Sequence, residues 1–340
     1  MIYNNILFHN VDELVPTANG VKICRFKEDV RLKINERGRR IANFCCGTEL
    51  RFVTDAKNIH IKFLTSLGGG VTGFGTSTVT VYCGDYCHTV KEIPNGVLTT
   101  VSFEKPEALL NMPEEFFEGN AFDKNVWRVH LANGNFEFCG IDTYGNEIRP
   151  PRAEEMPDMT ILSYGSSISH GCSSVANTQT YVNTFARLMK ADVLTKGIAG
   201  SCFSEYEIAD NFGAREDWDV ALMEIGINMV GSVETEEFAK RFGYLADKLY
   251  ATGKKIIFIT VPRYFAYYEK DTLSGKKLPE FNRIIREKCK EFDSDRVLLL
   301  EGTDVVKESN YLMSERLHPS THGHIDMGYN LYNMVKDWIK

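Results

Sequence analysis

The sequence has no apolar stretch that approaches the roughly 20 residues of a membrane span. Its first 13 residues lack both a basic start and a long apolar segment, so no secretory signal is visible. An excess of positive charge is also lacking, because the formal net charge is -7 and the pI is near 5.7. Binding of nucleic-acid phosphates needs a basic face, so these values argue against nucleic acid as a partner. The one charge run of note, Arg37-Gly38-Arg39-Arg40, is most simply a solvated turn.

Paired cysteine motifs are missing as well. The nine cysteines are odd in number and spread over both halves of the chain, and Cys83-x3-Cys87 lacks a second pair at metal-ligand spacing. This distribution suits reduced thiols better than a disulfide framework. We therefore expect a cytoplasmic protein.

The C-terminal half alternates apolar runs with amphipathic stretches. The apolar runs predict strands at 160–165, 192–198, 220–226, 255–261 and 297–301, and the amphipathic stretches predict helices near 178–190, 235–252, 277–292 and 322–339. Alternation of strands and helices is typical of a doubly wound parallel sheet with helices on both faces, so an α/β fold is expected here.

The N-terminal half shows a period of two instead. Ile59, Ile61 and Phe63 alternate with polar residues, and Asn19-Gly20, Asn95-Gly96 and Asn133-Gly134 are typical of tight turns. We predict an antiparallel β-sandwich, jelly-roll-like, over residues 1–150. The proline-rich and charged segment 150–157 is the expected linker to an α/β domain over residues 158–340.

Residues suited to chemistry follow the predicted strands of the C-terminal half. Ser167 ends Gly165-Ser166-Ser167, Gly200 lies in Lys196-Gly197-Ile198-Ala199-Gly200-Ser201, Asn228 ends Gly226-Ile227-Asn228, and His318 lies in Glu315-Arg316-Leu317-His318-Pro319-Ser320. The first tripeptide alone is more often a helix N-cap or a turn. However, parallel strands end at one rim of a sheet, which predicts that the four residues converge there. An imidazole at this rim would supply the base that a serine nucleophile needs near neutral pH.

These four segments resemble the blocks of the SGNH (GDSL-like) hydrolase superfamily, which carry a Ser, a Gly, an Asn and a His in that order. The resemblance covers residues 158–340, with Ser166 where the first block usually has Asp. It implies that Ser167 attacks an ester carbonyl and that His318 is the general base and acid. It further implies that the Ser167 and Gly200 amides and the Asn228 side chain form the oxyanion hole.

Glu315 marks a second departure, because the family usually has Asp three residues before the His. A glutamate can orient an imidazole if its extra methylene is accommodated. Otherwise a backbone carbonyl would orient His318, and Glu315 would be a surface charge paired with Arg316 or Lys307.

Other polar residues near these blocks have alternative explanations. His318, His322 and His324 have a spacing seen in zinc sites, but Pro319 interrupts the helix that such a site needs. Cys172 and Cys202 are more simply buried thiols than nucleophiles. We expect no metal and no cofactor.

A β-sandwich followed by an SGNH domain resembles carbohydrate esterase family two, a likeness supported in the N-terminal half only by Leu50-Arg51-Phe52-Val53-Thr54-Asp55. It implies a serine acetylesterase acting on a small carbohydrate ester, with Tyr82, Tyr86 or Trp127 of the sandwich facing the sugar. The alternatives are a thioesterase or lysophospholipase, and a non-catalytic carbohydrate-binding protein on a degenerate esterase scaffold. The sandwich could equally serve only to stabilise the catalytic half.

Overall fold

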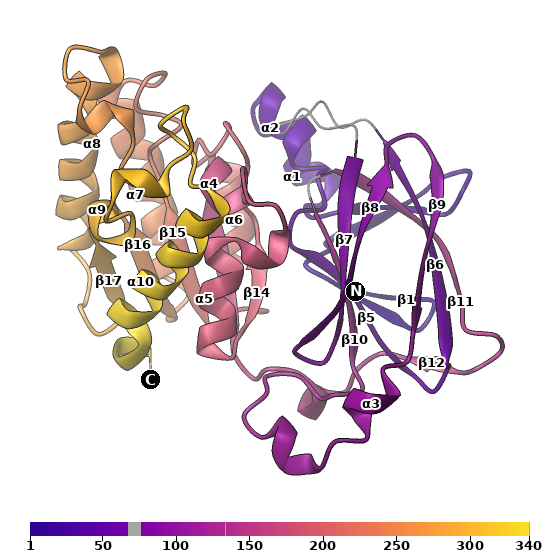
Figure 1. Ribbon diagram of the computed structural model, residues 1–340. Coiled ribbons are helices and arrows are strands. Elements are labelled where there is room, and N and C mark those ends of the chain that lie inside the picture. Colours follow the sequence, from indigo (N-terminus) through magenta and orange to yellow (C-terminus); the bar gives the residue numbers. More distant parts are fainter. Residues whose placement is uncertain (67–75, 133, 340) are drawn as a thin grey trace.

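The structure is a computed structural model that describes residues 1–66, 76–132 and 134–339. Figure 1 shows an antiparallel β-sandwich beside an α/β half, which confirms the predicted fold class. Asn133 of the third predicted turn lies outside the described residues.

The sandwich consists of two antiparallel sheets. The first has the order β1 (Ile2–Tyr3), β2 (Ile6–His9), β5 (Thr48–Thr54), β10 (Trp127–Leu131), β7 (Thr76–Cys83) and β8 (Tyr86–Pro94), and β12 (Ile148–Arg149) pairs with β5. The second has the order β3 (Glu13–Pro16), β4 (Val21–Cys24), β11 (Asn135–Asp142), β6 (Asn58–Ser66) and β9 (Leu98–Glu104).

Alternating side chains from the two sheets form the core of the sandwich. Ile59, Ile61 and Phe63 of β6 are fully buried, as their period of two predicts. Trp127 is buried too, and its ring centroid lies 4.9 Å from that of Phe103, so the expectation that Trp127 faces a sugar is wrong. Tyr86 stacks on Phe116 with 5.6 Å between the ring centroids.

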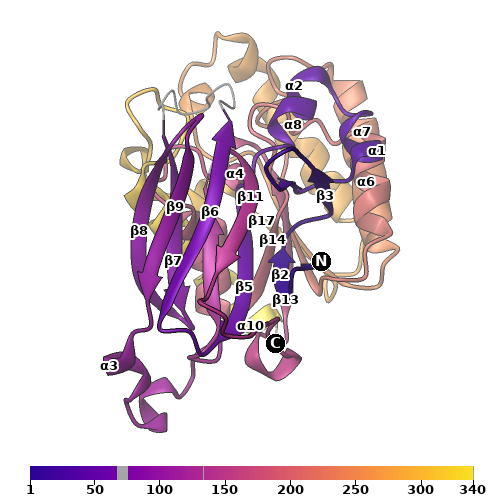
Figure 2. The ribbon, with the colours of Figure 1, turned by 90° about the vertical axis from the view of Figure 1, so that its right-hand side faces the viewer.

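Two short helices of the N-terminal half lie against the α/β half. They are α1 (Glu28–Arg31) and α2 (Glu36–Ile41), and Figures 1 and 2 both show them on the side of α6 (Tyr206–Gly213). The sequence Arg37-Gly38-Arg39-Arg40 is therefore helical and not the expected turn. Ile34 and Ile41 anchor α2 in the core of the α/β half, while its arginines stay on the surface. The remaining helices of this region are α3 (Glu107–Leu110) and the 3-10 turns Glu114–Phe117 and Ala153–Glu155.

The α/β half is built on five parallel strands in the order β14 (Asp192–Thr195), β13 (Thr160–Gly165), β15 (Val220–Glu224), β16 (Lys255–Ile259) and β17 (Val297–Leu300). Its other helices are α4 (Ser167–His170), α5 (Tyr181–Met189), α7 (Thr235–Tyr250), α8 (Leu273–Cys289), α9 (Gly302–Val305) and α10 (Thr321–Ile339), with 3-10 turns at Asn177–Gln179, Phe265–Tyr267 and Ser309–Tyr311. Helices α5 and α10 pack together on one face of the sheet, and α6, α7 and α8 pack on the other (Figures 1 and 2). The parallel strands bring their carboxyl ends, and the loops that follow them, to one edge.

No helix within the described residues is long and apolar enough to cross a membrane. All nine cysteines are described, and each is a free thiol.

Candidate active site

Ser167 lies at the turn where β13 becomes α4. Ser166 is the N-cap of this helix, and its hydroxyl accepts a hydrogen bond from the Ile168 amide at 3.1 Å. Gly171 ends the helix after one turn in the left-handed conformation, with φ 93°. A Cβ atom on Gly165 would lie 2.3 Å from Ser169 Oγ, so only glycine fits at the end of the strand. The turn therefore holds Ser167 at the carboxyl edge of the sheet.

Ser167, His318 and Glu315 form a continuous hydrogen-bonded chain. His318 Nε2 lies 2.8 Å from Ser167 Oγ, and His318 Nδ1 lies 2.7 Å from Glu315 Oε1. The first distance allows proton transfer from the Ser167 hydroxyl to the ring, and the second allows a hydrogen bond to Glu315 that orients the ring. The two residues on which the sequence argument depended, 167 and 318, are thus in direct contact although 151 positions separate them.

The loop that carries His318 explains how glutamate replaces aspartate. Arg316 adopts φ 67°, and this left-handed residue brings Glu315 back toward the backbone that follows it. Glu315 accepts hydrogen bonds from the His318 amide at 3.0 Å and the Leu317 amide at 3.3 Å. Partial burial raises the pKa of Glu315, but these amides and the His318 ring outweigh it and lower the pKa below its usual value. Glu315 is therefore not the surface charge paired with Arg316, because Arg316 pairs with Glu269.

The other two block residues lie on the neighbouring loops of the same edge. Gly200 follows β14 and has φ 65°, a left-handed conformation that favours glycine. Asn228 follows β15, and its Oδ1 accepts a hydrogen bond from the Cys202 amide at 3.1 Å. This bond fixes the orientation of the side-chain amide and leaves Asn228 Nδ2 as the donor group.

A buried carboxylate that the sequence interpretation missed supports the nucleophile turn. Glu224, at the end of β15, accepts hydrogen bonds from the Ser166 amide at 2.8 Å, from the Ser166 hydroxyl at 2.7 Å and from the Ser169 hydroxyl at 3.1 Å. Burial raises the pKa of Glu224 to about 7, against the opposing effect of these hydrogen bonds. An acidic residue inside the apolar run 220–225 was the available signal.

The remaining histidines serve other purposes. His170 is buried, and its Nδ1 lies 3.0 Å from the Gly197 carbonyl oxygen, which ties α4 to the loop that carries Gly200. His324 is also buried and bonds the Cys172 carbonyl oxygen at 3.0 Å. Burial lowers the pKa of His170 to about 3 and that of His324 to about 4, so both rings are neutral near pH 7. Within the described part of the chain, no cluster of three or more His, Cys, Asp or Glu side chains could hold a metal ion.

The two cysteines beside the site are inert. Cys172 and Cys202 are both buried, and burial raises the pKa of each thiol. A thiol kept protonated is a poor nucleophile, so neither cysteine competes with Ser167.

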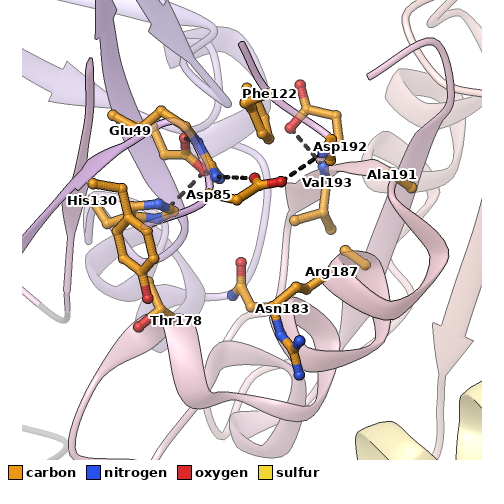
Figure 3. A pocket seen from close by; sticks show the side chains of 14 residues that line it. Glu49, Asp85, Phe122, His130, Thr178, Asn183, Arg187, Ala191, Asp192 and Val193 are labelled. Carbon is orange, nitrogen blue, oxygen red and sulfur yellow. Dashed lines mark hydrogen bonds and ion pairs between the residues drawn. The ribbon is translucent and has the colours of Figure 1, made fainter. Parts of the chain in front are cut away.

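A cavity of about 70 Å³ lies between the two halves (Figure 3). The described residues that line it are Glu49, Tyr82, Asp85, Ala121, Phe122, Arg128, His130, Thr178, Asn183, Ala186, Arg187, Ala191, Asp192 and Val193, and none of these belongs to the candidate active site. Tyr82, one of the aromatic residues expected to face a sugar, lines this cavity.

Buried ion pairs hold the two halves together at this cavity. Arg51 of β5 donates to Glu49 at 2.8 Å and, with both terminal nitrogens, to Asp192 of β14 at 2.6 and 2.7 Å. Glu49 also accepts from Arg128 at 3.0 Å. These contacts make Arg51 a structural link between the sandwich and the parallel sheet.

Comparison with known proteins agrees with this architecture. Residues 163–324 match the profile of the GDSL-like lipase/acylhydrolase family. The salicylyl-acyltransferase SsfX3 from a tetracycline biosynthetic pathway is 12% identical and superposes with a TM-score of 0.81, over 98% of this chain and 94% of that chain. A protein described as a GDSL-like lipase from Bacteroides ovatus is 15% identical, with a TM-score of 0.70, over 98% and 97% of the two chains. At these identities the likeness shows the fold alone. No curated protein matches the sequence.

Proposed function

We propose that this chain, whose residues 163–324 match the GDSL-like lipase/acylhydrolase family, is a serine esterase that removes small acyl groups, above all acetyl, from carbohydrates. The observation that carries the proposal is the hydrogen-bonded chain from Ser167 through His318 to Glu315. A serine hydroxyl becomes a nucleophile at neutral pH only when such a base is adjacent.

The first half of the proposed reaction transfers the acyl group to the enzyme. Ser167 Oγ attacks the ester carbonyl carbon while His318 Nε2 takes the hydroxyl proton, and Glu315 stabilises the imidazolium through Nδ1. The carbonyl oxygen gains negative charge, which the amides of Ser167 and Gly200 and Asn228 Nδ2 would stabilise. His318 then donates its proton to the departing sugar oxygen, and an acyl-serine remains.

The second half returns the enzyme to its starting state. His318 takes a proton from a water molecule, whose oxygen attacks the acyl-serine carbonyl, and the same donors hold the second oxyanion. Collapse releases the carboxylic acid and reprotonates Ser167 Oγ. One ester and one water thus give one acid and one alcohol.

The carbohydrate part of the proposal depends on the architecture of the chain. A β-sandwich packed beside the catalytic half resembles the arrangement of family-two carbohydrate esterases. The experiment for this part is a panel of acetylated oligosaccharides whose deacetylated products are mapped by mass spectrometry. Turnover of aryl esters without release of acetate from any sugar would contradict it.

Turnover of an aryl acetate and labelling by a fluorophosphonate probe test the esterase chemistry. We expect Ser167→Ala to abolish both, and His318→Ala to lower turnover by a similar factor, because nucleophile and base act as a unit. Glu315→Gln should keep the fold but lower kcat by up to about 10⁴-fold, because an amide can hold the wrong tautomer of the ring. Ser294→Ala, an exposed serine outside the site, is the matched control. Sugar binding with no turnover and no labelling of the unaltered protein would instead show a non-catalytic module.

A further inference from the structure

The N-terminal half places a guanidinium group against Gly200, whose amide is one of the proposed oxyanion donors. A Cβ atom built on Gly200 would lie 2.6 Å from both Cζ and Nη2 of Arg37 and 2.9 Å from its Nε. The planar end of Arg37 therefore covers the space above the Gly200 backbone. Arg37 belongs to α2, which comes from the first half of the chain but packs on the second.

Hydrogen bonds from the residues around α2 fix this position. Asn35, the N-cap of α2, donates through Nδ2 to Glu205 at 2.6 Å and to the Ser201 carbonyl oxygen at 3.4 Å. Its backbone amide donates to the same Glu205 carboxylate at 3.2 Å. The start of α2 is thereby tied to the residues that immediately follow Gly200.

A second arginine holds the other end of the Gly200 loop. The buried Arg25 donates through Nη1 to the carbonyl oxygens of Thr195 at 2.9 Å and Gly197 at 3.0 Å. The N-terminal half thus holds the loop on both sides of Gly200, which fixes the backbone of α2 relative to the loop.

Among the described residues, the Arg37 guanidinium has no charged partner. The contacts of the described residues include neither an ion pair nor a hydrogen bond from its guanidinium, and the residue is exposed. The positive charge of Arg37 acts on the Cys172 thiol. Burial raises the pKa of this thiol, and Arg37 lowers it to a smaller extent. The Cys172 amide in turn donates to the Ser167 carbonyl oxygen at 2.9 Å. The free positive charge therefore lies on the side of the nucleophile helix.

We propose that Arg37 binds an anionic group of the substrate, so that the enzyme selects acyl esters carrying a carboxylate or phosphate close to the scissile carbonyl. The guanidinium plane presents paired N–H donors that match the geometry of both anions. This inference rests on the proposed esterase function and narrows it, for a carbohydrate, to acidic sugars or sugar phosphates. It also gives the N-terminal half a direct part in substrate choice.

The test compares esters with and without a carboxylate group. Phenyl acetate against 4-acetoxybenzoate varies the charge of the alcohol part, and 4-nitrophenyl butyrate against 4-nitrophenyl succinate varies that of the acyl part. We expect the unaltered enzyme to favour the anionic member of at least one pair by about 10-fold or more in kcat/KM, the size of one charge-assisted hydrogen bond. The pair that shows the preference tells which part of the ester carries the anion.

Variants of Arg37 separate binding of an anion from mere packing over Gly200. Arg37→Gln should bring the anionic-to-neutral ratio to about 1, chiefly through KM, and Arg37→Lys should restore part of it. Arg37→Glu should reverse the selection, so that acetylcholine gains relative to its neutral isostere 3,3-dimethylbutyl acetate. Lys33→Gln, which removes one charge beside Asp210 of α6, is the control and should keep the original ratio.

Two results would overturn the inference. One is an unaltered enzyme that hydrolyses the neutral esters but shows no preference for either anionic partner. The other is a preference that survives in Arg37→Gln and Arg37→Glu. Failure to hydrolyse any of the four esters would refute the proposed function itself, and the inference would fall with it.

Discussion

Ser166 stands where the family usually has an aspartate, and its surroundings show how the nucleophile turn keeps a carboxylate. The Ser166 hydroxyl donates to Glu224 and accepts from the Ile168 amide, so the acidic group comes from the neighbouring strand β15. The apolar run in the sequence predicted this strand, but it did not indicate which groups would bind the Glu224 carboxylate within it. Which side chains meet across two parallel strands depends on register, here Gly165 opposite Glu224, and a single sequence does not encode register directly.

The raised pKa of Glu224 predicts a distinct dependence of stability on pH. A pKa of about 7 in the folded protein, against 4.5 for the ordinary group, means that folding favours the protonated form. Its contribution is then fully present below about pH 4.5 and is lost as the pH rises through 7. The free energy of unfolding, compared with that of Glu224→Gln, should fall by on the order of 3 kcal/mol across this interval.

Urea unfolding at pH 4.5, 5.5, 6.5 and 7.5 measures this difference. Glu308→Gln changes an exposed carboxyl group and serves as the control, for which a flat difference is expected. Parallel pH curves for the unaltered protein and Glu224→Gln would show that Glu224 ionises in the folded state as it does in the unfolded chain.

At the scale of elements, the length of an element determined whether the sequence revealed it. The strands β13 to β17 and the helices α5 and α7 lie within the predicted segments, because their apolar runs or stripes show in the sequence. Helices α8 and α10 overlap the predicted segments but begin at Leu273 and Thr321, earlier than the predicted 277 and 322. Helix α6 was missed because eight residues make only two turns. The six-residue helix α2 was taken for a turn, because its apolar anchors, Ile34 and Ile41, lie at its margins and four charged residues fill its interior.

The tight junction between β13 and α4 predicts that Gly165→Ala damages catalysis. The new methyl group would lie 2.3 Å from Ser169 Oγ and 2.7 Å from Glu224 Oε2, so the nucleophile turn must shift. We expect kcat for an aryl acetate to fall by about 100-fold or more, since displacements near 1 Å cost that much. Stability should fall by about 1–3 kcal/mol from overpacking.

Gly243→Ala is the matched control for this substitution. Gly243 lies inside α7, and apart from its chain neighbours and the backbone of the helix, no atom of the described residues lies within 4 Å of the position that an alanine methyl group would take there. Alanine at this position should leave kcat unchanged and stabilise the helix by about 0.5–1 kcal/mol. Equal kcat values for Gly165→Ala and the unaltered enzyme would show that the turn adapts to a side chain.

At the scale of the whole molecule, the sequence predicted both halves but not their mutual arrangement. Periodicity of two or of 3.6 residues describes how one element meets its own core. The contacts between the halves join residues such as Arg51 and Asp192, which are 141 positions apart and which no local pattern pairs. The segment Leu50 to Asp55 was noted only as a weak family likeness, whereas the structure makes Arg51 its key residue. For the same reason the proximity of Arg37 to Gly200 could not be predicted.

The buried ion pairs of Arg51 predict how the two halves depend on each other. Arg51→Met would leave the largely buried Asp192 without its main cation, while Glu49 would keep Arg128 as a partner. Removal of one partner from a buried ion pair typically costs about 3–5 kcal/mol, because the other charge stays buried and uncompensated. We therefore expect a clearly lower midpoint in thermal and urea unfolding, with the parallel-sheet half and the sandwich losing structure in separate transitions.

Arg283→Met breaks two exposed ion pairs on α8 and should change the midpoint little. A midpoint for Arg51→Met equal to that of Arg283→Met, in one cooperative transition, would show that apolar packing alone joins the halves.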